Sequence, residues 1–166
     1  MFEIGEKIVD KSGKVCEVLN IEEADYGIGA KKYYVLTPCF SSNPSLRIHI
    51  PVDQESRLRK IMTKNDVNDL INRLPEIETI WFINPKVRKT KFREIYTTGN
   101  PIEIFRLIKS FKYKKMEFLS ENKNLSFSDE TFLNEIKTNI YHEIALALDI
   151  DFEKVESYIY EHLKNN

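Results

Sequence analysis

The apolar pattern of this 166-residue chain changes after Leu58. Before that point, apolar residues come in short runs of strand-forming residues, such as residues 33–37, with Gly- and Ser-containing turns between them. After it they recur at helical spacing, as in residues 63–74. We therefore predict an α+β protein with a β module at residues 1–58 and a compact helical domain at residues 59–166.

The β module is expected to be a small antiparallel sheet or a barrel of Tudor or SH3 size. Four or five short strands are predicted, and they follow each other too closely for helical crossovers between parallel strands. In one of them apolar and polar residues alternate, so that Leu46, Ile48 and Ile50 are predicted to face the core and Arg47 and His49 to face outward.

The helical domain carries several local signals for the start of a helix. Asn-Pro occurs twice, and an amide side chain followed by proline is typical of the N-cap and first position of a helix. Thr63 and Asp66 form a capping-box pattern. We expect about five helices, with starting residues at Thr63, Asn84, Asn100, Ser128 and Asp151.

The sequence offers little for catalysis. It has no phosphate-binding glycine loop, no nucleophile elbow and no HExxH zinc motif, and the three histidines His49, His142 and His162 are far apart. Cys16 and Cys39 have no metal-ligand spacing and are expected to be free thiols. We predict a protein that is not an enzyme and that holds neither a metal nor another cofactor.

No apolar run is long enough to cross a membrane, and the N-terminal residues lack the basic and apolar regions of a signal peptide. We expect a cytoplasmic protein with no membrane partner.

The charge distribution is strongly uneven although the net charge is only −1. Residues 86–115 contain ten Lys and Arg against two Glu, which gives a local charge of +8, whereas residues 116–166 carry −7. Such a basic block can neutralise phosphates and bind nucleic acid. The alternative is an ordinary solvated helix surface. The residues predicted to contact DNA are Lys86, Arg88, Lys89 and Lys91, all expected to be exposed, together with Lys112, Lys114 and Lys115.

Trp81, the only tryptophan, lies just ahead of the basic block. Because Asn84 and Pro85 predict a helix start, Trp81 is expected in the connection that leads into this helix. Two interpretations stay open. The indole can be exposed and act as a wedge in the minor groove of DNA, or it can pack in the helical core.

Several segments occur in a familiar order. They are residues 2–9 (FEIGEKIV), 33–36 (YYVL), 47–52 (RIHIPV), 58–61 (LRKI), Trp81 followed by Arg88, 98–100 (TGN), 125–126 (LS) and 143–148 (EIALAL). Taken together, this ordered set resembles the CarD/CdnL family of bacterial transcription regulators that bind RNA polymerase, across essentially the whole chain.

The resemblance implies a Tudor-like N-terminal domain that binds the β subunit of RNA polymerase. It also implies a helical domain that meets promoter DNA at the upstream edge of the −10 bubble. The family's wedge tryptophan corresponds to Trp81, and basic residues around Arg88 hold the DNA backbone. The polymerase contact corresponds to Arg47, Ile48, His49, Ile50 and Pro51, which we expect to lie at an exposed sheet edge.

From the resemblance we expect a regulator that stabilises the open promoter complex. We also expect the protein to be a monomer. A Tudor/SH3-like adaptor whose basic patch binds an acidic partner protein is the alternative.

Overall fold

The computed structural model describes residues 1–166 and divides the chain into two compact units, Met1–Ile61 and Met62–Asn166. We refer to them as the β unit and the helical unit. The division falls shortly after Leu58, where the sequence pattern changes. Each unit has its own hydrophobic core, and each is described by itself.

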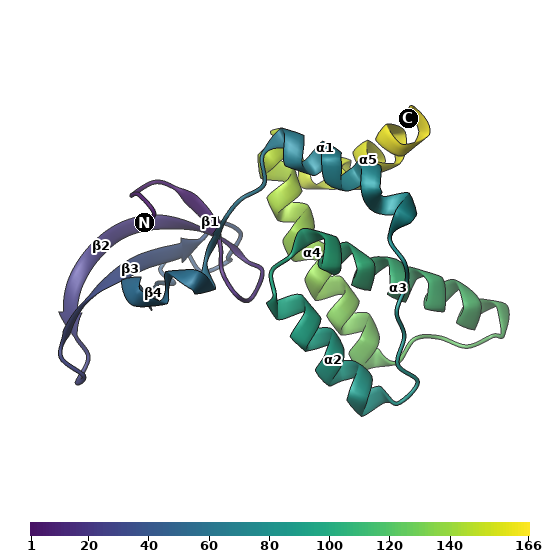
Figure 1. Ribbon diagram of the computed structural model, residues 1–166, viewed down its shortest axis with the longest axis horizontal. Coiled ribbons are helices and arrows are strands. Elements are labelled where there is room, and N and C mark those ends of the chain that lie inside the picture. Colours follow the sequence, from purple (N-terminus) through teal and green to yellow (C-terminus); the bar gives the residue numbers. More distant parts are fainter. The chain divides into compact units, whose positions relative to one another are not determined.

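The β unit is a five-stranded antiparallel sheet, which confirms the predicted α+β class (Figure 1). The strand order is β4-β3-β2-β1-β5, so that β4 and β5 form the two edges. The strands are β1 (Lys7–Val9), β2 (Val15–Asp25), β3 (Ala30–Pro38), β4 (Ile48–Pro51) and β5 (Arg59–Lys60), with a 3-10 helix (Val52–Arg57) before β5.

The strands β2 and β3 are longer than predicted. β2 has 11 residues and β3 has 9, and they form one continuous hairpin with a bulge between Val18 and Asn20. The hairpin turn is closed by Asp25, whose Oδ1 accepts hydrogen bonds from the backbone N–H groups of Gly27 and Gly29. Both glycines have φ of 89°, a conformation that other residues rarely adopt. This turn is one of the Gly-containing turns that the sequence predicts between strands.

The inward-facing residues of β4 follow the prediction only in part. Ile50 is buried and Ile48 is partly buried in the core of the β unit. Leu46 is exposed, because it precedes the strand and lies in the loop before it. The prediction that it faces the core is wrong.

The helical unit contains the predicted five α-helices (Figure 1). They are α1 (Lys64–Arg73), α2 (Pro85–Thr97), α3 (Pro101–Ser120), α4 (Phe127–Leu148) and α5 (Val155–Lys164), with 3-10 turns at Leu74–Glu76 and Phe152–Lys154. α4 packs against α1, α3 and α5, and α2 packs against α3. None of the helices has the combination of length and apolar character that a membrane span requires.

The observed helix starts show which capping signals in the sequence predicted the first helical residue correctly. Thr63 forms the predicted capping box. Asn84 accepts hydrogen bonds from two backbone N–H groups of the first turn of α2, and Asn100 accepts one from the first turn of α3. α4 begins at Phe127 and not at Ser128, because Ser126 caps it by accepting from the N–H of the third helical residue. α5 begins at Val155, since a 3-10 turn follows Asp151.

Candidate functional site

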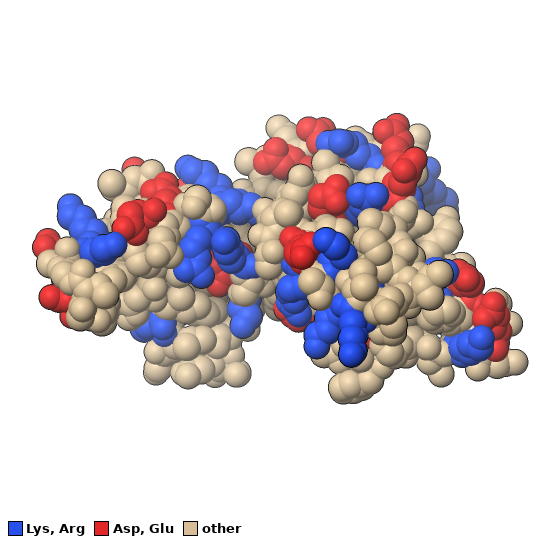
Figure 2. All heavy atoms as spheres, turned by 60° about the horizontal axis from the view of Figure 1, so that its bottom comes forward, with Lys and Arg blue, Asp and Glu red and all other residues tan.

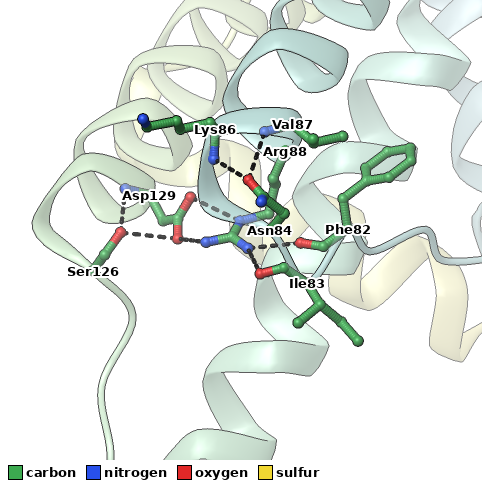
Figure 3. A network of polar contacts seen from close by, with 8 residues as sticks. All are labelled: Phe82, Ile83, Asn84, Lys86, Val87, Arg88, Ser126 and Asp129. Carbon is green, nitrogen blue, oxygen red and sulfur yellow. Dashed lines mark hydrogen bonds and ion pairs between the residues drawn. The ribbon is translucent and has the colours of Figure 1, made fainter.

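The start of α2 is fixed by its own sequence. Asn84 Oδ1 accepts hydrogen bonds from the backbone N–H groups of Lys86, at 2.9 Å, and Val87, at 3.2 Å (Figure 3). Pro85, at the first helical position, has no N–H that needs a partner. The side chains of Lys86 and Lys89 are exposed on the first turns of this helix.

Arg88 is buried at the same end of α2, with 6% of its surface exposed. Its Nη2 donates to Asp129 Oδ2 at 2.7 Å and its Nε to Oδ1 at 3.2 Å, which makes a two-point ion pair. Its Nη1 donates to the carbonyl oxygens of Phe82, at 2.7 Å, and Ile83, at 3.3 Å (Figure 3). Asp129 is held in turn by Ser126, the N-cap of α4. Arg88 thus joins the segment before α2 to the first turn of α4.

The prediction that Arg88 is exposed is therefore wrong. Its position on α2 faces α4, where Asp129 supplies a carboxylate that the local sequence around Arg88 does not contain. Because the Arg88 side chain is buried and makes four hydrogen bonds to protein oxygens, Arg88 positions its neighbours and is not presented to a phosphate.

Trp81 is partly buried and packs against the helical core. Its ring meets Phe111 edge-on at a centroid distance of 5.7 Å, Phe92 at 5.9 Å and Phe118 at 6.4 Å. The guanidinium carbon of Arg88 lies 4.4 Å from the ring centroid. The expectation of a substantially exposed indole outside the core is not met, and the core-packing interpretation describes the observed contacts.

Most of the basic block is already paired. Seven of its ten cations form ion pairs: Arg88–Asp129, Lys91–Glu94, Arg93–Glu135, Arg106–Glu103, Lys112–Glu156, Lys114–Glu117 and Lys115–Glu130. The ammonium group of Lys109 donates to the carbonyl oxygens of residues 74, 75 and 77. Lys109 therefore has no ion pair but is hydrogen-bonded, whereas the ammonium groups of Lys86 and Lys89 have neither an ion pair nor a hydrogen bond within the protein. Within the basic block, the lysines without an intramolecular partner therefore lie at the start of α2, and Lys and Arg gather on one face of the helical unit in Figure 2.

The predicted basic residues of α3 do not form one surface. Lys112 pairs with α5 through Glu156, Lys115 pairs with the first turn of α4, and Lys114 lies 5.8 Å from the Trp81 ring. Burial raises the pKa of Glu156, but the ammonium groups of Lys112 and Lys137 lower it more, so that this pKa lies below its usual range. Lys112 thus forms an intramolecular ion pair with Glu156 at the surface.

Two exposed apolar residues near Lys86 were not predicted. Ile83 is 92% exposed and directly precedes the N-cap of α2, and Phe127 is 88% exposed and directly follows the N-cap of α4. The residue before an N-cap often packs on the fourth helical residue. In α2 that residue is Arg88, which is not apolar, and this signal in the sequence could have indicated an exposed Ile83.

In the β unit, β4 provides the predicted open edge. It pairs only with β3, so its other side carries backbone groups without a neighbouring strand. The predictions that β4 lies at an edge and that Arg47 and His49 are exposed are confirmed. Of the predicted contact residues, Ile48, His49, Ile50 and Pro51 form the strand, and Arg47 precedes it.

The two outward side chains next to this edge are tied to the unit itself. Arg47 Nη1 donates to the carbonyl oxygens of Pro44, at 2.8 Å, and Leu46, at 2.9 Å. His49 Nε2 lies 3.4 Å from a carboxylate oxygen of Glu22. These contacts fix both side chains on the surface beside the free edge of β4.

No group of three or more His, Cys, Asp or Glu side chains is arranged to hold a metal ion. The chain matches no protein-family model, and no curated protein sequence matches it.

Proposed function

We propose that this protein is a bacterial transcription regulator without enzymatic activity. In this proposal the β unit binds the β subunit of RNA polymerase, and the helical unit contacts promoter DNA near the upstream edge of the −10 bubble and stabilises the open complex. The observation that carries the proposal is the presence of a free sheet edge in one unit and an uncompensated basic helix start in the other. The resemblance of the sequence to the CarD/CdnL family supports it.

For the polymerase, the edge of β4 is suited to pairing with a strand of the partner. Backbone hydrogen bonds supply affinity in this mode, and the outward side chains supply specificity. Arg47 and His49 are the two exposed side chains that can select the partner at this edge.

For the DNA, the contact residues proposed from the geometry differ from those expected from the sequence. Lys86 and Lys89 contact phosphates, with Lys91 as a weaker contributor because it pairs with Glu94. Trp81 and Arg88 act indirectly, by fixing the segment that leads into α2. Lys112, Lys114 and Lys115 contribute little, since each has an acidic partner within the protein.

Such a regulator acts as a monomer in the cytoplasm. A direct test is the retention of RNA polymerase by the immobilised full-length chain. We expect the polymerase to be retained through its β subunit and Arg47→Glu to weaken retention without changing the thermal stability of the protein. An exposed lysine of the same unit that lies away from β4, Lys11, provides the control Lys11→Glu. Equal retention by both variants would remove Arg47 from the interface.

A protein-interaction adaptor is the second candidate function. One observation favours it: the ion pairs of the helical unit cancel most of the basic block, which leaves less charge for DNA than the sequence suggests. The lifetime of open promoter complexes distinguishes the two functions, because an adaptor of this kind has no effect on it.

A further inference from the structure

A cavity of about 310 Å³ lies between α2 and α4, beside the exposed Phe127. Its volume is at the lower end of the range of ligand pockets. The residues used in the argument below are Lys89, Phe92 and Arg93 from α2 and Phe127, Phe132 and Glu135 from α4. The lining of the cavity therefore combines aromatic and charged side chains.

The aromatic residues of this wall differ in how accessible they are. Phe92 is buried, with 1% of its surface exposed, and the guanidinium carbon of Arg93 covers Phe132 at 4.4 Å from the ring centroid. Phe127 is 88% exposed. It provides a free face on which a planar group can stack.

The charges around the cavity leave a positive balance. The carboxylate of Asp129 is neutralised by Arg88 at 2.7 Å, and that of Glu135 accepts two hydrogen bonds from Arg93, at 2.9 and 3.3 Å. Lys89 lines the cavity and carries no ion pair, and Lys86 precedes it by three residues in α2, which places both lysines on the same side of the helix. A ligand with a planar ring and a neighbouring anionic group fits this arrangement.

We propose that the cavity binds one unstacked nucleobase of a single-stranded segment, with its ring on Phe127 and its flanking phosphates at Lys86 and Lys89. Aromatic side chains next to basic residues are the usual means by which proteins hold single strands, because every base offers a flat face for stacking. The inference rests on the proposed function, since a melted promoter supplies such bases. It extends that function from duplex contact to the melted strand.

The site is tested with the full-length protein and a short single-stranded oligonucleotide that carries one 5-iodouracil. On irradiation this base crosslinks to aromatic side chains on which it is stacked, and mass spectrometry identifies the residue. We expect the crosslink at Phe127. Phe127→Ala should weaken binding of the single strand about tenfold, as expected for the loss of one stacked base, and leave duplex binding unchanged. Tyr160→Ala, which removes another exposed aromatic ring of the helical unit, should have no effect.

A crosslink at another residue, or equal affinities of the Phe127→Ala and Tyr160→Ala variants for the single strand, would overturn the inference. Thermal unfolding of both variants checks that they are folded, which is expected because both rings are exposed. Retention of RNA polymerase separates the two claims. If polymerase is retained and Phe127 is not crosslinked, the site is wrong and the proposed function stands. If Phe127 is crosslinked and polymerase is not retained, the site stands and the proposed function is wrong.

Discussion

The guanidinium group of Arg88 lies 4.4 Å from the centroid of the Trp81 ring and forms a two-point ion pair with Asp129. Trp81 and Arg88, two of the residues expected from the sequence to contact DNA, therefore contact each other inside the helical unit. Their shared effect is to fix the segment from Phe82 to Asn84, on which the exposed Ile83 and the first turn of α2 depend.

Arg88→Met is expected to destabilise the protein, because it leaves the carboxylate of Asp129 without its partner in a nearly buried position. Removal of one member of a buried ion pair typically costs about 3–5 kcal/mol. The free energy of unfolding from urea titration measures this loss, and the double variant Arg88→Met/Asp129→Leu should recover much of it. A stable single variant with weaker DNA affinity would instead mean that Arg88 contacts phosphate.

Trp81→Ala is expected to lower the free energy of unfolding, since it removes edge-on contacts with Phe92, Phe111 and Phe118. Truncation of a fully buried large aromatic residue costs roughly 3–5 kcal/mol, and the partial exposure of Trp81 places its loss near the lower end. Trp81→Phe is the control and should lose much less. An unchanged unfolding transition in Trp81→Ala, together with reduced DNA binding, would support the wedge interpretation instead.

Lys86→Gln and Lys89→Gln are each expected to reduce the salt dependence of duplex binding. Every phosphate contact that is lost lowers the slope of log K against log salt concentration by about 0.9. Lys112→Gln is the matched control and should leave the slope unchanged, because Lys112 is paired with Glu156. Fluorescence anisotropy at several salt concentrations gives the slopes. If the slopes of all three variants equal that of the wild-type protein, the start of α2 does not contact phosphates.

The sequence predicted a structural feature correctly where the residues that form it are close together in the chain. Asn84 and Pro85 determine the start of α2, and Asp25 and Gly27 form the hairpin turn, because the groups that bond lie within a few residues. The burial of Arg88 could not be predicted, since its partner Asp129 lies 41 residues away in the sequence. A basic residue in a basic block looks the same whether it is exposed or paired across two helices.

The length of the strands and the position of the cavity could not be predicted from local sequence either. The end of β2 lies beyond the core, and both faces of it are accessible, so the alternation that marks a half-buried strand is lost around Glu22 and Glu23. The cavity beside Phe127 combines residues of α2 and α4, and their contact depends on tertiary packing. Local sequence signals contain no information on such a pairing.

Stability is expected to fall as the solution becomes more acidic, because burial lowers the pKa of His142 below its usual range. The neutral form is favoured in the folded protein, so this contribution is complete above the unfolded pKa of about 6.5 and is lost as the pH falls through the folded pKa. The His142 ring packs beside Phe152, with 4.7 Å between the two ring centroids. Thermal unfolding between about pH 7 and pH 5 measures the effect, and His142→Gln should remove most of the slope. An equal slope in this variant would assign the effect to another group.

The lifetime of open promoter complexes tests the central claim most directly, because it requires both units to act in the same molecule. With bacterial RNA polymerase and a competitor that traps free enzyme, the wild-type chain should lengthen the half-life of the open complex several-fold. Arg47→Glu should abolish the effect through the polymerase contact, Lys86→Gln/Lys89→Gln should abolish it through the DNA contact, and Tyr160→Ala should retain it. An unchanged half-life with the wild-type chain, or full activity in both the Arg47 and the lysine variants, would contradict the account.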